Sequence, residues 1–311
     1  MSFYLVTGGA GFIGSNIVEE LLRRGETVRV IDNFVTGKEE NIAEFLDRIE
    51  VLRGDIRDMG TVKNAVKGVD YVLHQAALRS VPRSVDDPVA TNESNVTGTL
   101  NILMAARDGG VKRVVYASSS SVYGDAPDLP KREDHLPSPI SPYAVSKLTG
   151  EYYCTVFSKI FGLQTVSLRY FNVFGPNQDP ESKYAAVVPL FIRMGMSDKE
   201  LEVHGDGLQS RDFTYVANVV AANLLAARAE NVSGKVFNIA GGERYTVLDI
   251  ARLVGRFLDK KLQWRHTPPR KGDVRHTMAD IGKAQRILGY EVKVGFEEGM
   301  KRTVDFFKTR T

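Results

Sequence analysis

The fold of this chain is decided by the stretch Phe3-Tyr4-Leu5-Val6-Thr7-Gly8-Gly9-Ala10-Gly11-Phe12-Ile13-Gly14. Its apolar start predicts a short buried strand, and Ile13, Ile17 and Leu21 then recur at helical spacing, so the glycines lie in a turn between strand and helix. Two overlapping glycine spacings, one starting at Gly8 and one at Gly9, let the backbone approach a pyrophosphate at the helix N-terminus. The stretch therefore predicts a dinucleotide-binding turn, with a glycine-rich turn that binds no ligand as the alternative.

A second predicted strand, residues 27–31, ends at Asp32, which lies 18 residues after Gly14. A carboxylate at this point accepts hydrogen bonds from the ribose hydroxyls of a dinucleotide and repels a 2′-phosphate. The sequence therefore favours NAD over NADP.

Further strand patterns cover residues 51–56, 70–74 and 112–117, and a helical pattern runs from about residue 88 to 107. Strands that alternate with helices form βαβ units and a parallel sheet. We predict an α/β fold, a Rossmann-type doubly wound parallel sheet with a smaller C-terminal substrate-binding domain. Ligands bind such sheets beyond the carboxyl ends of the strands. Several small or polar groups fall at that edge, namely residues 8–14, Asp32, Asp55, Ala76 and Ser118 to Ser121.

Composition fits a globular enzyme, with 311 residues, 43% hydrophobic content and a net charge of +3. A late basic run has only Trp264 as an interleaved aromatic residue, so a small molecule with a diphosphate explains its arginines better than nucleic acid does. The single cysteine, Cys154, is interpreted as a buried helix residue, and no metal site is expected. Because no signal peptide precedes the first strand and no apolar run reaches about 18 residues, we expect a cytoplasmic protein that does not bind membranes.

The segment Ser141-Pro142-Tyr143-Ala144-Val145-Ser146-Lys147 predicts a helix start, with Ser141 as N-cap and Pro142 in the first turn. Spacing of four places Tyr143 and Lys147 on one helix face. An ammonium beside a phenol lowers the phenol pKa, so Tyr143 is predicted to act as a proton acceptor near neutral pH. A solvated pair without chemistry is the alternative.

The serine run Ser118 to Ser121 follows the strand at residues 112–117. A polar turn whose hydroxyls bond nearby backbone groups is the simpler interpretation. At the ligand edge of the sheet, however, Ser119 can bridge a substrate oxygen to Tyr143.

Motifs continue along the chain as Arg169-Tyr170-Phe171-Asn172-Val173-Phe174-Gly175, Gly205-Asp206-Gly207, Ser210-Arg211-Asp212-Phe213 and Arg270-Lys271-Gly272-Asp273-Val274-Arg275-His276. With the features above, they make essentially the whole chain resemble the extended short-chain dehydrogenase/reductases and, among these, the UDP-sugar 4-epimerases. The resemblance implies an NAD-binding domain over residues 1–168, rejoined by residues 213–240, and a mainly UDP-sugar-binding domain over residues 169–311. It also implies a homodimer, formed through helices near residues 89–107 and 143–160.

The resemblance also assigns the site residues. The catalytic set is Ser119, Tyr143 and Lys147. The residues implied for NAD are Gly8, Gly11, Phe12, Ile13, Gly14, Asp32, Asn33, Thr36, Gly37, Asp55, Ile56, Gln75, Ala76, Ala77, Asn95, Tyr143, Lys147 and Phe171. The residues implied for the UDP-sugar are Arg79, Ser119, Ser120, Tyr143, Asn172, Val187, Val188, Val203, Arg211, Arg270, Asp273 and Thr277.

The implied activity is a UDP-hexose 4-epimerase that interconverts UDP-glucose and UDP-galactose through a transient 4-keto sugar on tightly bound NAD. Tyr143 would move the proton, Lys147 would bind the nicotinamide ribose, and Asn172, Arg211 and Arg270 would hold the UDP group. The alternatives are a UDP-glucuronate 4-epimerase or decarboxylase, a 4,6-dehydratase, a simple NAD-linked reductase and a non-catalytic nucleotide-sugar-binding protein. Dehydratases of this family carry an acid pair directly after the position of Ser119, and the decarboxylases a glutamate at that of Ser121; this chain has serines.

The choice of sugar is predicted from Thr277, seven residues after Arg270. In the family the matching position carries tyrosine in enzymes confined to UDP-glucose and UDP-galactose, and a small residue in those that also admit N-acetylated sugars. Threonine therefore favours an enzyme that also epimerises UDP-N-acetylglucosamine and UDP-N-acetylgalactosamine. Arg79 is a departure, because the N-acetylhexosamine branch can have glycine there. The preferred sugar and the oligomeric state stay open at this stage.

Overall fold

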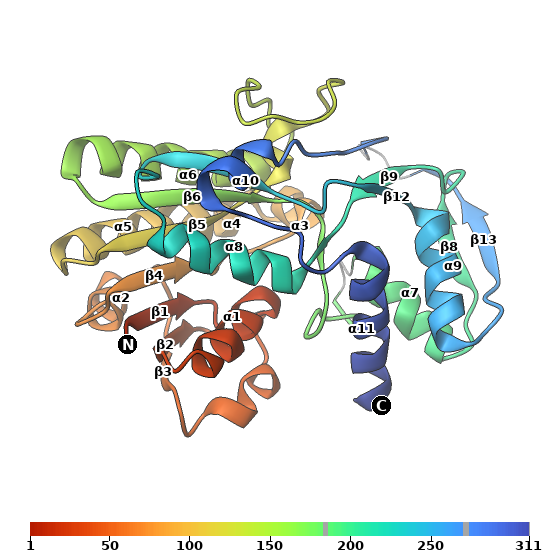
Figure 1. Ribbon diagram of the computed structural model, residues 1–311, viewed down its shortest axis with the longest axis horizontal. Coiled ribbons are helices and arrows are strands. Elements are labelled where there is room, and N and C mark those ends of the chain that lie inside the picture. The colour runs from red at the N-terminus through yellow and green to blue at the C-terminus, as the bar shows by residue number, and fades with distance from the viewer. Residues whose placement is uncertain (183–185, 270–273, 311) are drawn as a thin grey trace.

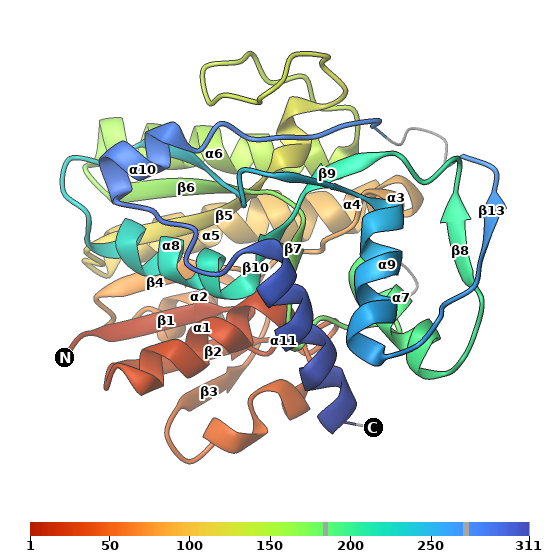
Figure 2. The ribbon, with the colours of Figure 1, turned by 45° about the vertical axis from the view of Figure 1, so that its right-hand side comes forward.

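The computed structural model of this protein describes residues 1–182, 186–269 and 274–310. Its centre is a seven-stranded sheet in the order β11-β6-β5-β4-β1-β2-β3 (Figures 1 and 2). All neighbouring strands pair in parallel. The strands are β1 (Phe3–Thr7), β2 (Thr27–Asp32), β3 (Glu50–Arg53), β4 (Tyr71–His74), β5 (Arg113–Ser119), β6 (Gln164–Tyr170) and β11 (Lys235–Ile239).

Helices cover both faces of the sheet because its buried strands are apolar on both sides. Val6 and Val30 point to the face covered by α1 (Phe12–Arg23) and α8 (Val216–Arg228). Leu5 and Ile31, the neighbouring residues, point to the opposite face, which is covered by α2 (Met59–Ala65), α5 (Gly98–Asp108) and α6 (Pro142–Phe161). The period of two along each strand therefore builds two separate cores.

The segment between β4 and β5 is helical over most of its length. It contains α3 (Val81–Asp86) and α4 (Pro88–Asn92), and a π-helical turn, Glu93–Thr97, joins α4 to α5. The helix predicted at about residues 88–107 is therefore present, with a wider turn in its middle.

Most of the remaining elements form a smaller part beside the sheet, on the right of Figures 1 and 2, whereas α10 (Gly282–Leu288) packs against β11 and α8 of the main part. The smaller part is built from three short two-stranded sheets and their flanking helices. The elements of the later half outside the main sheet and α8 are β7 (Val173–Phe174), α7 (Val187–Met196), β8 (Leu201–His204), β9 (Ser210–Asp212), β10 (Thr214–Tyr215), β12 (Arg244–Thr246), α9 (Val247–Leu258), β13 (Trp264–Thr267), α10 (Gly282–Leu288) and α11 (Phe296–Thr309). The chain returns to the main sheet through α8 and β11, since β11 pairs with β6.

The predicted α/β class with a doubly wound parallel sheet is confirmed. The strand predicted at residues 51–56 is shorter, because β3 ends at Arg53 and Asp55 lies in the turn that follows. Cys154 is buried, as predicted, among apolar residues of the face that carries α6. In the described part of the chain, none of the helices has both the length and the apolar character that crossing a bilayer requires.

Candidate active site

A cavity of about 670 Å³ lies along the carboxyl edge of the sheet and continues under the smaller part of the molecule. That volume lies within the range typical of small-molecule sites, about 300 to 1,000 Å³. Most of the residues predicted for the site line this one cavity: Gly8, Gly11, Phe12, Ile13, Gly14, Asp32, Asn33, Thr36, Gly37, Ile56, Gln75, Ala76, Ala77, Arg79, Ser119, Ser120, Tyr143, Lys147, Asn172, Arg211 and Thr277.

The glycine turn between β1 and α1 is packed too tightly to hold side chains. A Cβ on Gly14 would lie 2.1 Å from the carbonyl oxygen of Gly8. Gly8 has φ +67°, and a Cβ there would come within 2.8 Å of the Ala76 backbone. The backbone and the N-terminus of α1 therefore face the cavity directly, which is the arrangement that binds a pyrophosphate. The residues present fit a dinucleotide cofactor.

Asp32 ends β2 beside this turn and is nearly buried on the cavity wall. Its carboxylate accepts hydrogen bonds from the backbone N–H groups of Ala10 (3.0 Å) and Phe34 (2.8 Å). Burial raises the pKa of Asp32, and these two donors partly offset that rise. The two donors thus hold the carboxylate in place on the cavity wall.

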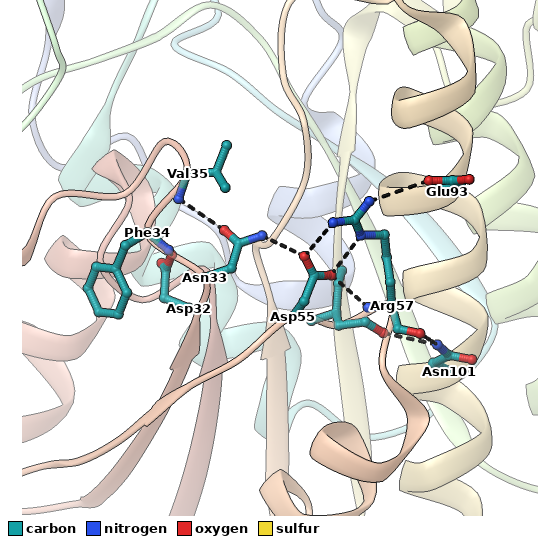
Figure 3. A network of polar contacts seen from close by, with 9 residues as sticks. Asp32, Asn33, Phe34, Val35, Asp55, Arg57, Glu93 and Asn101 are labelled. Carbon is teal, nitrogen blue, oxygen red and sulfur yellow. Dashed lines mark hydrogen bonds and ion pairs between the residues drawn. The ribbon is translucent and has the colours of Figure 1, made fainter.

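Asp55 supports the wall from behind, through the polar network in Figure 3. It accepts a hydrogen bond from Asn33 (2.8 Å) and forms an ion pair with Arg57. Arg57 also pairs with Glu93 (3.4 Å), so the turns after β2 and β3 are tied to the helix of residues 88–108. Asp55 does not line the cavity; among the described residues, its contacts position Asn33, which does.

Tyr143 lies in the first turn of α6, whose N-cap is Ser141, as predicted. Both Tyr143 and Ser119, the last residue of β5, line the cavity, and the Ser119 side chain is near enough to lower the pKa of the phenol. Ser119 Oγ in turn accepts from Ser121 through both the backbone N–H (3.2 Å) and the side-chain hydroxyl (2.9 Å). Since Ser119 Oγ accepts from both donors, its own proton is left to donate to a group in the cavity.

Lys147 lies one turn further along α6 and is buried. Its ammonium donates to the carbonyl oxygen of Ala117 at 2.8 Å and lies 5.9 Å from the centre of the Tyr143 ring. Burial lowers the pKa of Lys147 to about 8, although the nearby Glu151 carboxylate opposes this shift. The spacing of four therefore brings both groups to one end of the cavity.

The sequence predicted that Lys147 lowers the pKa of the Tyr143 phenol. For the polypeptide without bound NAD, that prediction is wrong. The pKa of Tyr143 is raised because burial outweighs the two influences that lower it, which are the Ser119 side chain and the positive charge of Arg79. Spacing indicated which residues share a helix face, but it carried no information on the desolvation of the phenol.

The sequence analysis did not identify Glu151, a buried acid on α6. Glu151 forms a two-bond ion pair with Arg169 of β6, at 2.9 and 2.8 Å, and accepts a hydrogen bond from Ser118 of β5. It locks the active-site helix against the two strands that end at the cavity. Glu151 lies four residues after Lys147, and an acid on the inward face of an otherwise apolar helix was the signal for it.

The far end of the cavity is formed by segments distant in sequence. Asn172, with φ +31°, donates to the backbone carbonyl of Asp212 at 3.0 Å and lies 3.5 Å from Thr277 Oγ1. The backbone N–H of Thr277 donates to the Ser210 carbonyl at 3.0 Å. Arg211 of β9 donates to the carbonyls of Ser210 and Arg275. Three predicted residues are thereby brought together.

Some predicted residues lie elsewhere. Val188 and Val203 are fully buried core residues of the smaller part, and Val187 packs against the same core. Phe171 is buried in a separate cluster with Tyr123. Asn95 lies behind the wall, where its side chain bonds both the N–H and the carbonyl of Leu78 and thereby fixes the loop after β4. Arg270 and Asp273 lie outside the described residues.

The fold and the site together define a nucleotide-binding α/β enzyme in which a tyrosine, a serine and a lysine face a dinucleotide site. Residues 4–240 match the model of the NAD dependent epimerase/dehydratase family. The chain belongs to this family, and the prediction of NAD as cofactor is confirmed.

Individual relatives are similar over the full length of the chain. A UDP-glucose 4-epimerase of Mycolicibacterium smegmatis is 36% identical and covers 99% of both chains. A UDP-glucuronate 4-epimerase of Thermodesulfobacterium geofontis is 34% identical over 99% of this chain and 97% of its own. The crystal structure of a UDP-glucose 4-epimerase from Thermotoga maritima, with UDP-glucose, superimposes with a TM-score of 0.94 at 38% identity over 99% of both chains.

Proposed function

We propose that this protein is a UDP-hexose 4-epimerase that works through a 4-keto sugar. The observation that carries the proposal is that Ser119, Tyr143 and Lys147 line the same cavity as the glycine turn and Asp32. Among the described lining residues, Asp32 is the one carboxylate. It ends β2, which lies three strand spacings, or about 14 Å, from β5 across the sheet. The sugar end is therefore equipped for proton transfer at a hydroxyl by a tyrosine, without an acid.

In the proposed mechanism, Tyr143 takes the proton from the sugar 4-hydroxyl while Ser119 holds the same oxygen. When bound, NAD supplies a hydride acceptor for C4 and a positive ring that favours the phenolate. Once the keto sugar has turned over in the cavity, the hydride would return to the opposite face of C4, and Tyr143 returns the proton to the oxygen. Lys147 binds the nicotinamide ribose, and Arg211, Arg270, Asp273 and Asn172 hold the UDP group. No net oxidation results.

The lack of an acid among the described lining residues of the sugar end also disfavours a dehydratase or a decarboxylase. Elimination of a 6-hydroxyl needs an acid to protonate the leaving group. Ser120 and Ser121 occupy the positions where the dehydratases and decarboxylases carry acids, and both line the cavity. The matching relatives include enzymes for neutral and for acidic sugars, so the substrate is proposed from the residues of this chain.

For the sugar, we propose that both UDP-glucose/galactose and their N-acetylated counterparts are accepted. Thr277 lines the cavity and is held by backbone contact to β9. Its small side chain leaves the volume that a tyrosine ring would occupy. Residues 1–168 with 213–240 would hold NAD, and residues 169–311 mainly the UDP-sugar.

We also propose a homodimer formed through α4 and α6. Val145, Tyr152, Val156 and Ile160 follow one face of α6 and are exposed, Ile160 by 70%. Val89 on the adjacent α4 is 66% exposed. Contiguous apolar surface of this kind is typical of subunit interfaces. Light scattering of the purified protein tests it, and a monomer at micromolar concentration would contradict it.

The decisive experiment is incubation of the purified protein with UDP-glucose, UDP-galactose and both UDP-N-acetylhexosamines, without added NAD, followed by separation of the epimers. Turnover without added cofactor is expected, because the hydride returns to the sugar and NAD is retained. A requirement for stoichiometric NAD, with NADH accumulating, would identify a dehydrogenase instead.

A further inference from the structure

The feature behind this inference is Asp212, the last residue of β9 at the sugar end of the cavity. In Figure 2, β9 lies between the main sheet and the pair formed by β8 and β13. Asp212 is fully buried and does not line the cavity, whereas Arg211, the residue before it, does. Burial of a carboxylate is costly unless other groups compensate it, so the contacts of Asp212 indicate what it holds in place.

Three backbone N–H groups from two other segments converge on this carboxylate. Its Oδ1 atom accepts from Gly241 at 2.8 Å and from Gly242 at 3.2 Å, just after β11. Its Oδ2 atom accepts from Ala279 at 3.1 Å, in the segment that leads to α10. The Asp212 side chain therefore joins β9 both to the end of a main-sheet strand and to the segment of residues 274–279.

The chain after β11 approaches β9 closely at this junction. A Cβ on Gly241 would lie 2.6 Å from the carbonyl oxygen of Phe213 and 3.4 Å from the Asp212 carboxylate. The backbone of one segment is thus packed directly on the backbone of the other, and the carboxylate bonds across the contact.

Two of the segments joined here carry side chains of the sugar end. Asn172 donates to the Asp212 carbonyl oxygen at 3.0 Å. Thr277, two residues before Ala279, lines the cavity, and its N–H donates to the Ser210 carbonyl at 3.0 Å. The segment of Thr277 is therefore held to β9 on two sides, by backbone pairing at Ser210 and by the carboxylate of Asp212.

We propose that Asp212 is a positioning residue for the nucleotide end of the substrate, where its carboxylate holds Arg211 and Thr277 in the arrangement that binds UDP. The inference rests on the proposed UDP-sugar activity, in which Arg211 and Asn172 hold the UDP group. The hydrogen bonds of Asp212 described above do not reach α6 or β5, which carry the catalytic side chains. Loss of the carboxylate should therefore weaken binding and leave the chemical step intact.

The test is Asp212→Asn, which keeps the shape of the side chain but replaces one acceptor oxygen by an NH₂ donor. Whichever way the amide turns, its NH₂ group meets a backbone N–H, so one of the two joined segments is released. The Kd for UDP, measured by titration calorimetry, and the KM for UDP-galactose should each rise about 10-fold, the value of one hydrogen bond to a charged group. The kcat and the NAD retained per folded protein should stay within about threefold of wild type.

Asp206→Asn is the matched control, because it makes the same substitution at a partner of the same segment. Asp206 pairs with Arg275 at 2.6 Å, but both side chains are about half exposed. Since an exposed ion pair contributes little, Kd and KM should change by less than about twofold.

A measurement on the wild type covers the case in which Asp212→Asn does not fold. Hydrogen exchange at the amides of Gly241, Gly242 and Ala279 should slow when UDP binds, because the ligand stabilises the segments that these amides join. The amide of Gly60, on α2, is also bonded to an aspartate side chain, at 2.9 Å, and should exchange at the same rate with and without UDP.

Three outcomes would overturn the inference. The first is an Asp212→Asn protein whose Kd for UDP and KM are unchanged. The second is a variant in which kcat and retained NAD fall together with UDP affinity, which would make Asp212 a general support of the fold. The third is exchange at the three amides that does not respond to UDP. A wild type that neither binds UDP nor epimerises any UDP-sugar contradicts the proposed function instead, and the wild-type titration shows this separately.

Discussion

The two ends of the cavity are built in different ways. The cofactor end comes from consecutive elements, β1, α1 and β2, and offers mainly backbone, with Gly8 and Gly14 held where a Cβ would clash. The sugar end offers side chains, and two of them, Asn172 and Thr277, are separated by 105 residues of sequence. Where the backbone lines the cavity, a substitution cannot change the groups that face the ligand without moving the main chain. Where side chains line it, each substitution changes one contact with the ligand. The cofactor end should therefore be intolerant of substitution and the sugar end adjustable.

The largest effect is expected at the junction of the two ends. Tyr143→Phe removes the proton acceptor but keeps the ring, so turnover should fall by about 100- to 10,000-fold while retained NAD and stability stay near wild type. Epimerisation rate and NAD content are measured on the same preparation. More than about a tenth of wild-type turnover would exclude Tyr143 as the base.

A methyl group at Gly14 should damage the cofactor end as a whole. Gly14→Ala places a Cβ 2.1 Å from the Gly8 carbonyl oxygen, so β1 and α1 must separate. Overpacking of this kind costs about 1 to 3 kcal/mol or more of the free energy of unfolding. Bound NAD should be lost in proportion, as read by absorbance of the denatured supernatant. Gly60→Ala is the matched control, since its Cβ would make only an ordinary contact at 3.4 Å; equal behaviour of the two variants would contradict the tight turn.

Asp32→Ala should weaken the cofactor end more selectively. It removes the ribose acceptor and the repulsion of a 2′-phosphate together, so NAD affinity should fall by about 10- to 150-fold and NADP binding should increase. Cofactor titration of the apoprotein gives both values. Asp55→Ala, behind the wall, is the control and should not admit NADP. Unchanged NAD occupancy in Asp32→Ala would show that this carboxylate does not contact the ribose.

The difference between the two ends also explains how far sequence alone could predict them. The glycine turn, Asp32 and the Tyr143–Lys147 pair are each defined by local spacing, and all of them reach the cavity as predicted. Val188 and Val203, assigned to the sugar by family resemblance, lie in the core instead. Their placement depends on how α7 and β8 pack, and an apolar residue that suits a ligand also suits a core.

The pairing of charged side chains and the desolvation of titratable groups could not be predicted from the sequence either. The pKa of Tyr143 depends on burial and on Arg79, which is 64 residues away in sequence. Glu151 is paired with Arg169 from a neighbouring strand, and no local pattern names that partner. Spacing in the sequence predicts which residues share one helix or strand. It does not predict which residues of other helices and strands contact them in the fold.

The smallest effect, and the clearest test of the adjustable end, is expected at Thr277. Thr277→Tyr fills volume beside Asn172, where the N-acetyl group is proposed to lie, and overpacking by about 1 to 3 kcal/mol corresponds to a loss of about 5- to 150-fold in kcat/KM for the acetylated sugars. UDP-glucose and UDP-galactose should be nearly unaffected, and NAD content should not change, because the substitution leaves the cofactor end intact. Thr277→Ser is the control and should keep both sugar pairs. Equal loss of both pairs in Thr277→Tyr, or a wild type inert on acetylated sugars, would show that this position does not select the sugar.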